Sequence, residues 1–420
     1  MKEKRAKAIL IDVIDLDTPK DEARKRLGEL ENLVNTYGSI VVVKTIQRKG
    51  KPDYETYIGK GKVEEIRLTG KEKKAEILIV NNILKPRQVF NLQEILRKDE
   101  IKVWDRIDLI LKIFDKHAKS TEAKLQIELA GIRHMGPRIY GMGIELSRQA
   151  GAMGLRAGAG EANIEIMKRH LRKHELSIQQ KLKHYDLIRA GHRKRRRRQN
   201  LKTVALVGYT NAGKSSVLNA LTNKGAYVAD QLFATLDTRV GKLYIKPKIQ
   251  NNKKYVKGME ILISDTIGFI QDLPPSLIQA FKSTLAETVE ADLILHIIDI
   301  TDSQIHKKIK VVEKILDQLG LRDKPKLYVF NKIDLIPEIQ QPKELRKPVR
   351  PKGILRAGKN TAKILGWESE KPKFKAAEDP GKLKRNYEKF SPVFVSANEK
   401  INLDKLIEKI EGKIKKYSQT

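Results

Sequence analysis

The stretch GYTNAGKS at residues 208–215 decides the fold of the C-terminal half of this chain. It matches the pattern G-x-x-x-x-G-K-[ST], in which successive backbone N–H groups and the N-terminus of a helix surround phosphate oxygens. An apolar run at 203–207 supplies the strand before the loop, and residues 216–222 supply the helix after it. We therefore predict a phosphate-binding α/β domain with a mostly parallel sheet over residues 201–420.

The residues of this loop have predicted contacts with a nucleotide. Lys214 is placed to neutralise the β- and γ-phosphate oxygens, and the Ser215 hydroxyl takes a position on Mg²⁺. Asn211 has two interpretations: it stabilises the loop, or it helps to bind K⁺, whose charge can stand in for an arginine finger. The predicted contact residues are Gly208, Tyr209, Thr210, Asn211, Ala212, Gly213, Lys214 and Ser215.

A second motif, SDTIGFIQ at 264–271, has the features of a γ-phosphate sensor. Asp265 ends an apolar strand, where its carboxylate can reach Mg²⁺ through water, and the Gly268 backbone N–H can meet the γ-phosphate. Many GTPases carry a water-orienting glutamine directly after this glycine, whereas this chain has Phe269. Upstream, Thr235 is a candidate switch hydroxyl for Mg²⁺, with Thr238 as the competitor. We expect slow hydrolysis until a partner completes the site.

Two later motifs predict that the base is guanine. Asn331, Lys332 and Asp334 form an N-K-x-D set at the end of an apolar run. The Asp334 carboxylate can accept from the N1–H and amine of guanine, a donor pattern that adenine lacks. Ser396 and Ala397 follow the last expected strand, where the backbone can contact guanine O6. Together with the phosphate loop, these motifs predict a guanine nucleotide site.

Residues 1–105 alternate between apolar, β-branched runs and segments with helical spacing, which predicts an N-terminal α/β domain with an open parallel sheet. The segment YIGKGKVEEI at 57–66 has two interpretations: a glycine turn around an anion, or a loop that opens a helix. The expected strands are 7–16, 39–46 and 75–82, and the expected helices are 20–38 and 86–98.

Residues 106–200 predict an antiparallel helical hairpin. One amphipathic helix is expected over 106–134 and a second, very basic one over 161–198. The connection at 135–160 is rich in glycine and contains three arginines, Arg138, Arg148 and Arg156. It is either a loop that brings backbone and arginines close to a phosphate-bearing partner, or a disordered linker.

The composition excludes several classes of protein. The chain has 420 residues, of which 40% are hydrophobic and 33% charged, as is typical of a globular protein of two or three domains. No apolar run approaches the roughly 18 residues that span a bilayer, so we expect no stable membrane insertion. The basic N-terminus is interpreted as a first strand rather than a signal peptide. The absence of cysteine excludes disulfides and thiolate metal sites, and fits a cytoplasmic location.

The net charge of +33 indicates a polyanionic partner. Basic residues cluster on the second hairpin helix and on an insertion at about 341–390 that is rich in Lys, Arg, Pro and Gly. Nucleic acid is the first candidate partner and an anionic membrane surface the second. The alternative is that the charge serves only solubility or reflects a lysine-rich proteome.

Taken together, these motifs resemble the HflX family of translation-factor-related GTPases, close to the Obg group. The resemblance covers nearly the whole chain and includes GYTNAGKSSVLNALT, DQLFATLDT, DTIGFIQDLPPSLIQAFKSTLAET and NKIDLI, with IGKGKVEEI, DRIDLILKIF and EAKLQIELA upstream. It implies an N-terminal α/β domain (1–105), a helical hairpin (106–200) and a C-terminal GTPase domain (201–420). It also implies binding to the large ribosomal subunit and its rRNA, with the hairpin loop near the peptidyl-transferase region. We expect a monomer in the cytoplasm.

The resemblance further implies which residues bind GTP and Mg²⁺. The catalytic residues would be Lys214, Thr235 and Gly268, and Mg²⁺ would be held by Ser215 and Thr235. The remaining implied contacts are Phe233, Ala234, Leu236, Asp237, Asp265, Thr266, Ile267, Asn331, Lys332, Ile333, Asp334, Ser396, Ala397 and Asn398. Family members can split or rescue stalled ribosomes under stress, and some bind ATP through the N-terminal region. The hairpin loop departs from the usual GGGIGTRGPGE of the family, because residues 150–161 are AGAMGLRAGAGE.

The resulting hypothesis is a GTP-gated protein that binds the large ribosomal subunit through basic surfaces and is released after hydrolysis. One alternative is an RNA-binding or remodelling protein that uses nucleotide hydrolysis as a motor and is not specific to ribosomes. Another is a GTP-regulated scaffold with negligible hydrolysis. The basic run at the end of the second helix could equally be a nuclear address or a membrane-surface patch.

Overall fold

A computed structural model describes residues 5–151, 157–199, 201–222, 239–250, 254–256, 258–266, 268–270, 277, 285–336 and 379–417. The chain forms two compact units, of which the first contains Met1–Arg193 and the second most of the residues from Lys194 onward. Each unit is described separately below. The division into three domains expected from the sequence stays a prediction.

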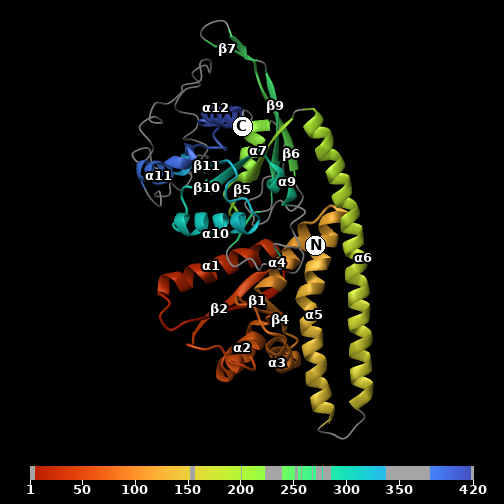
Figure 1. The fold of residues 1–420 in the computed structure, drawn as a ribbon. Coiled ribbons are helices and arrows are strands. Elements are labelled where there is room, and N and C mark those ends of the chain that lie inside the picture. The colour runs from red at the N-terminus through yellow and green to blue at the C-terminus, as the bar shows by residue number, and fades with distance from the viewer. Residues whose placement is uncertain are drawn as a thin grey trace, which may run out of the picture. The chain divides into compact units, whose positions relative to one another are not determined.

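The first unit contains a four-stranded parallel sheet with the strand order β2-β1-β3-β4 (Figure 1). Its elements are β1 (Lys7–Ile14), α1 (Lys20–Tyr37), β2 (Ile40–Arg48), α2 (Lys60–Lys73), β3 (Ile77–Val80), α3 (Pro86–Leu96) and β4 (Lys102–Asp105). Apolar side chains of α2 and α3 share one core with the sheet, including Val63, Leu92 and Ile11. Helix α1 ends at Gly38, whose φ of 99° is left-handed, as the glycine in the sequence indicated. The open parallel sheet is therefore confirmed.

Residues 57–66 lead into helix α2, which confirms one of the two interpretations of this segment. Gly59 precedes the first residue of α2, and its N–H donates to the Gln47 side chain at 2.9 Å. Since that N–H already has a partner inside the protein, it is not directed at an anion.

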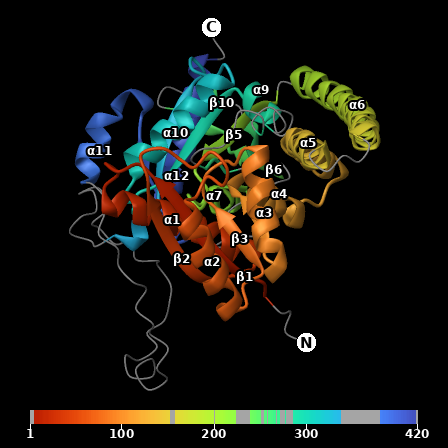
Figure 2. The same ribbon diagram turned by 90° about the horizontal axis from the view of Figure 1, so that it is seen from below.

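Three helices complete the first unit: α4 (Arg106–His117), α5 (Thr121–Gly151) and α6 (Ala157–Arg198), of which α6 continues into the second. Glu122 near the start of α5 pairs with Arg189 near the end of α6, whereas Arg133, further along α5, pairs with Glu175, which comes earlier in α6. Helices α5 and α6 are therefore antiparallel, and Figure 2 shows them side by side. This confirms the predicted hairpin.

The extent of these helices differs from the prediction in two places. The expected helix 106–134 is interrupted at 118–120, where Ala118 is extended and the Ser120 hydroxyl accepts from the Ala123 N–H in the first turn of α5. The expected glycine-rich loop at 135–160 is mostly helical, because α5 continues to Gly151 and α6 begins at Ala157. Each glycine costs a helix only about 1 kcal/mol, and the residues between them are mostly good helix formers. Arg156 lies outside the described residues, as does the side chain of Arg148.

A buried polar cluster joins β4, α4 and α5. Arg138 of α5 donates to Asp105 and, at 2.7 Å, to Asp108. His134 lies 3.3 Å from both carboxylates. Burial alone would lower the pKa of His134, but its hydrogen bonds to the two aspartates outweigh this and raise it. Because Arg138 already pairs with both carboxylates, the cluster joins α5 to the end of β4 rather than leaving oxygens for a metal.

The second unit contains a six-stranded sheet with the order β12-β11-β10-β5-β9-β6, parallel except for the β6–β9 pair. The strands are β5 (Lys202–Gly208), β6 (Arg239–Ile245), β9 (Met259–Asp265), β10 (Leu293–Asp299), β11 (Lys326–Asn331) and β12 (Val393–Phe394). The helices are α7 (Lys214–Thr222), α9 (Ala286–Glu290), α10 (Ile305–Gln318), α11 (Pro380–Asn386) and α12 (Leu403–Tyr417), and β7 (Lys248–Gln250) pairs with β8 (Lys254–Val256). The predicted phosphate-binding domain with a mostly parallel sheet is confirmed.

The end of the predicted insertion packs on this sheet. Residues 341–378 of the insertion lie outside the described residues, but α11 and the short turn that follows it are described. The Phe390 ring stacks on Tyr328 of β11 at 4.2 Å between centroids, and Tyr387 also contacts Tyr328. The insertion therefore rejoins the fold next to the strand that carries the N-K-x-D set. Within the described part of the chain, no helix is both long and apolar enough to cross a membrane.

Candidate nucleotide site

The phosphate loop connects β5 to α7, and its glycines allow close approach to neighbouring backbone and side chains. A Cβ atom on Gly208 would lie 2.3 Å from the Ile297 carbonyl oxygen. Gly213 has a left-handed φ of 88°, and a Cβ there would lie 2.3 Å from Asn331 Nδ2. Side chains at these two positions would push the loop away from β10 and β11.

Lys214 begins α7 with its ammonium folded back over the loop. Its Nζ donates to the carbonyl oxygens of Gly208 at 3.4 Å and Tyr209 at 3.2 Å. Burial lowers the pKa of Lys214 to about 8, against the opposing effect of Asp265. A phosphate group beside this ammonium would restore its charged form, because an opposite charge raises the pKa of a lysine.

Ser215 and Asp265 come together as the sequence predicted. The Ser215 hydroxyl donates to Asp265 Oδ2 at 2.6 Å, and Asp265 is fully buried at the end of β9. A hydroxyl and a carboxylate oxygen are hard donors of the kind that Mg²⁺ prefers. The pair therefore fits a magnesium ion held between the loop and β9.

Phe269 is turned into the protein and is bonded to the phosphate loop through its backbone. Its N–H donates to the Gly208 carbonyl at 3.0 Å, and its carbonyl accepts from the Thr210 N–H at 2.8 Å. Only 1% of the residue is exposed. The neighbouring Gly268 lies so close to the loop that a Cβ there would be 2.9 Å from Lys214 Nζ. The backbone hydrogen bonds of Phe269 thus hold the neighbouring Gly268 against the phosphate loop.

Asn331 connects the phosphate loop to both base-end motifs. Its Nδ2 donates to the Ala212 carbonyl at 3.1 Å, and its Oδ1 accepts from the Ala397 N–H at 3.1 Å. The Ser396 hydroxyl donates to Asp334 Oδ1 at 2.6 Å. These hydrogen bonds join the phosphate loop, the N-K-x-D set and the segment at Ser396. In each hydrogen bond the two residues are more than 60 positions apart in the sequence. The spatial convergence that the sequence predicted at the strand ends is present.

The remaining predicted residues lie on the same edge of the sheet or outside the described part of the chain. Thr266 donates to the Leu206 carbonyl at 2.6 Å, the Ile333 N–H donates to the Val395 carbonyl at 3.3 Å, and Asn398 is exposed. Residues outside the described part are Phe233, Ala234, Thr235, Leu236, Asp237, Thr238 and Ile267.

Two supporting side chains were missed by sequence reasoning. Asp299 at the end of β10 accepts from Lys332 at 2.7 Å, and Lys332 itself has a left-handed φ of 68°. Lys308 of α10 lies 4.5 Å from the centre of the Tyr209 ring in the phosphate loop. The available signal for Asp299 was a carboxylate at the end of a third apolar run. No comparable signal marks Lys308, because cation–π partners follow no sequence spacing.

Comparison with known families and proteins matches most of this chain. Residues 24–115 match a family described as GTP-binding GTPase N-terminal, 117–196 one described as GTP-binding GTPase middle region, and 203–332 one described as 50S ribosome-binding GTPase. GTPase HflX of Caldanaerobacter subterraneus is 43% identical over 79% of this chain and 73% of its own length. GTPase HflX of Alkalihalophilus pseudofirmus is 40% identical over 75% and 71%, respectively. A GTP-binding protein of Sulfolobus solfataricus, solved with GDP, is similar with a TM-score of 0.48 and 23% identity over 98% of this chain and 99% of that one.

Proposed function

This chain belongs to the HflX family of GTPases, and on that premise we propose that it binds the large ribosomal subunit in its GTP form and splits or rescues stalled ribosomes under stress. It is an enzyme that hydrolyses GTP to GDP and phosphate. The match of residues 203–332 to the 50S ribosome-binding GTPase family carries the ribosomal part of the proposal. In this proposal the protein acts as a monomer in the cytoplasm.

The proposed nucleotide roles follow from the convergence at the sheet edge. Lys214 and the loop N–H groups hold the β- and γ-phosphates, and the Gly268 N–H senses the γ-phosphate. Ser215, Asp265 and Thr235 would hold Mg²⁺, which neutralises charge on the phosphates when bound. Asp334 selects guanine, while Asn331 holds its loop against the phosphate loop. The residues 233–237 would complete the contacts, as the family resemblance implies.

The proposed hydrolysis is slow in the isolated protein, because the Phe269 side chain is buried and has no group that could orient a water. A ribosomal partner would position the water or supply charge to the developing transition state. Binding of GTP would favour the ribosome-bound form, and hydrolysis would permit release.

Helix α6 provides a surface suited to rRNA. Its exposed basic side chains include Lys168, Arg169, Arg172, Lys173, Lys181, Lys183, Lys194, Arg195 and Arg198. Rows of Lys and Arg on one helix neutralise nucleic-acid phosphates and release counterions. The proposed affinity for ribosomal RNA therefore falls steeply as salt concentration rises.

Sedimentation with ribosomal particles tests the proposal. Full-length protein is pelleted with large subunits in the presence of a non-hydrolysable GTP analogue, GDP or no nucleotide, over a series of salt concentrations. We expect most protein in the pellet with the analogue, and less as salt rises. Equal pelleting in all three nucleotide states would rule out the GTP gate.

The same experiment separates the main alternative, an RNA-binding or remodelling protein without ribosome specificity. Free structured RNA and anionic vesicles replace the subunits in parallel samples. Binding to free RNA that equals binding to subunits, with the same nucleotide dependence, would favour that alternative. Preferential binding to vesicles would instead assign the basic helix to a membrane surface.

A further inference from the structure

Thr210, the third residue of the phosphate loop, carries a hydroxyl that packing does not explain. Only 6% of the residue is exposed, and its Oγ1 makes no hydrogen bond within the described part of the chain. A buried hydroxyl without a partner costs free energy, and a valine of nearly the same shape would avoid that cost. A group of this kind in a folded protein needs a reason other than stability, and a catalytic role is one.

Two side chains of the phosphate loop converge next to Gly268. A Cβ atom built on this glycine would lie 2.8 Å from the Thr210 Cγ2 methyl and 2.9 Å from Lys214 Nζ. The Thr210 hydroxyl is bonded to the same Cβ as that methyl, so it lies in the same small region. Lys214 and the Gly268 N–H are the groups proposed to contact the γ-phosphate. Thr210 is therefore beside the place where the γ-phosphate reacts.

Backbone hydrogen bonds fix Thr210 in this position. The Thr210 N–H donates to the Phe269 carbonyl at 2.8 Å, and the Phe269 N–H donates to the Gly208 carbonyl at 3.0 Å. The buried Phe269 ring anchors this segment in the core. Phe269 has no side-chain group that could hold a water, but its backbone positions a neighbouring residue that has one.

We propose that the Thr210 hydroxyl is a catalytic residue that accepts a hydrogen bond from the attacking water in GTP hydrolysis. A hydroxyl has two acceptor lone pairs, so it can hold a water without giving up its own proton. In the reaction, the water oxygen bonds to the γ-phosphorus as the bond to the β–γ bridging oxygen breaks. One water proton stays on the new phosphate, the other passes to a γ-phosphate oxygen, and the bridging oxygen remains on GDP. Thr210 neither gains nor loses a proton.

A single hydroxyl contact agrees with slow hydrolysis in the isolated protein. A glutamine amide both donates and accepts in one fixed plane, whereas a hydroxyl holds the water at one point. In this proposal Thr210 supports the basal rate, and a ribosomal partner raises it through a further contact or through charge. The proposal rests on the GTPase activity and not on ribosome binding, so it is tested without ribosomes.

Single-turnover hydrolysis by Thr210 variants tests the proposal. Full-length protein in excess is mixed with GTP and Mg²⁺, and phosphate release is compared with the affinities for GDP and a non-hydrolysable GTP analogue. We expect Thr210→Val to slow hydrolysis about tenfold, the worth of one hydrogen bond, and Thr210→Ser to restore most of the rate. Both variants should keep both affinities, because a contact to the attacking water acts on the reaction step.

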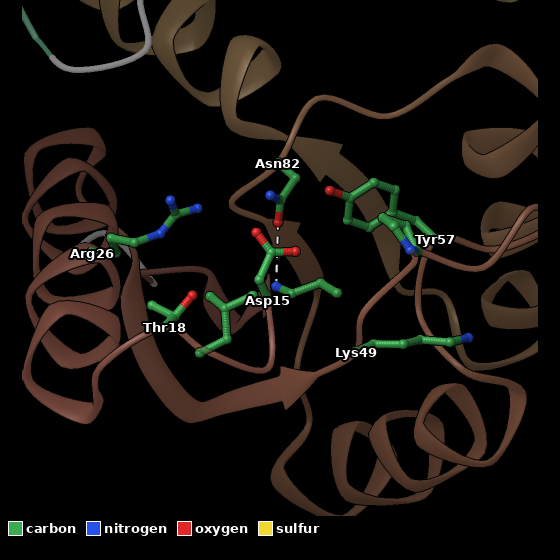
Figure 3. Close-up of a pocket in the computed structure, with 9 residues that line it drawn as sticks. Asp15, Thr18, Arg26, Lys49, Tyr57 and Asn82 are labelled. Carbon is green, nitrogen blue, oxygen red and sulfur yellow. Dashed lines mark hydrogen bonds between the residues drawn. The ribbon is translucent and has the colours of Figure 1, made fainter.

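The first compact unit has a polar cavity of its own, with a volume of about 170 Å³ (Figure 3). Its lining residues all lie between Val13 and Asn82, and they include Tyr57, whose φ of 65° is left-handed. Lys214→Ala removes the proposed phosphate contact in the second unit and leaves this cavity unchanged. It is therefore the blank of the assay, because phosphate that this variant releases does not come from the phosphate loop.

Thr288→Val is the matched control. Thr288 lies on α9, which leads into the amino end of β10, and it is fully buried with a hydroxyl that likewise has no hydrogen bond among the described residues. Both valine variants should raise Tm slightly, because each removes a buried hydroxyl without a partner. Only Thr210→Val should slow hydrolysis. If Thr210→Val instead lowers Tm, Thr210→Ala compared with Thr210→Ser gives the same contrast.

Three outcomes would overturn the proposal. The first is a rate in Thr210→Val, or in Thr210→Ala, that equals the rate of the unmodified protein. The second is a loss of rate that Thr210→Ser does not restore, which would assign the residue to packing. The third is weaker binding of the GTP analogue with an unchanged rate, which would assign the hydroxyl to a γ-phosphate oxygen rather than to the water.

Discussion

At the scale of single residues, Phe269 distinguishes this nucleotide site from that of many GTPases. It occupies the position that holds a water-orienting glutamine in many GTPases, yet both of its backbone polar groups are bonded to the phosphate loop. Its ring is buried. A different side chain at this position would therefore lose the core packing of the Phe269 ring, and it would have to leave the core to contact a water.

Phe269→Gln is expected to destabilise the protein without accelerating hydrolysis. The substitution removes a buried ring and buries an amide, which should lower the free energy of unfolding by about 3 kcal/mol. Denaturant melts and single-turnover GTP hydrolysis measure the two effects, with Phe269→Leu as the apolar control. A glutamine variant that hydrolyses GTP faster than the unmodified protein would show that the side chain can turn toward the phosphate.

The affinity for GDP is expected to depend on pH through Lys214. Its pKa is about 8 in the free protein, and bound phosphates raise it. Below that pKa the lysine is already charged, so binding takes up no proton there. Above it, binding requires proton uptake, and affinity should fall by up to about tenfold per pH unit.

Titrations at several pH values on either side of this pKa, in two buffers of different protonation heat, measure the affinity and the proton uptake together. Lys214→Arg keeps its charge at every pH in this range and should lose the dependence. An affinity for GDP that is unchanged across the range would contradict the lowered pKa.

Turnover is expected to be the same in KCl and in NaCl. Asn211 is exposed and has a left-handed φ of 63°, a conformation that asparagine and glycine tolerate. This backbone requirement is a sufficient reason for an asparagine, so Asn211→Gly should retain activity, while Asn211→Ala should lose about 1–2 kcal/mol of loop stability. Faster hydrolysis in potassium that disappears in Asn211→Gly would assign the side chain to K⁺ instead.

At the scale of elements, the position of α5 depends on a buried ion cluster that no sequence pattern indicated. Arg138 reaches back 33 residues to Asp105, where β4 ends and α4 begins. Strand β4 has only four residues, so its alternation is too short to be recognised. The glycines at 135–160 also concealed the helical course of α5. In both cases tertiary contacts outweigh local preference.

Arg138→Leu is expected to loosen α5 from the N-terminal sheet. The change removes the Arg138 guanidinium from buried Asp105 and leaves His134 as its remaining basic neighbour, and breaking a buried ion pair typically costs about 3–5 kcal/mol. Arg133→Leu is the matched control, because it breaks the half-exposed pair with Glu175 and should cost about 1 kcal/mol or less. Hydrogen exchange of the α5 amides together with denaturant melts measures both. Equal losses in the two variants would show that the cluster adds no special stability.

At the scale of the whole molecule, the two sheets were more predictable than the segments between them. Asp265, Asn331 and Ser396 each end an apolar run, and the carboxyl ends of parallel strands meet at one edge. That rule was enough to place the site residues together. It could not locate Lys308, which comes from a helix face, or the cavity at Tyr57, which depends on a loop conformation rather than on a motif.

The net charge of +33 is also a property of the whole molecule, and it favours association with the proposed partner, rRNA. Electrostatic attraction brings a basic protein to rRNA whatever nucleotide it carries. Control by GTP must therefore come from the nucleotide site, through a difference in affinity between the GTP and GDP states. In this account the ribosome positions the attacking water or supplies charge to the transition state, which the buried Phe269 side chain cannot do.

Single-turnover GTP hydrolysis with and without large ribosomal subunits tests this account most directly. The unmodified chain is loaded with GTP, and phosphate release is followed alone, with large subunits, and with an equal mass of free RNA. We expect a slow rate alone, a clear rise with large subunits, and little change with free RNA. Fast hydrolysis without any partner, or a rate that large subunits leave unchanged, would contradict the claim that the ribosome completes the site.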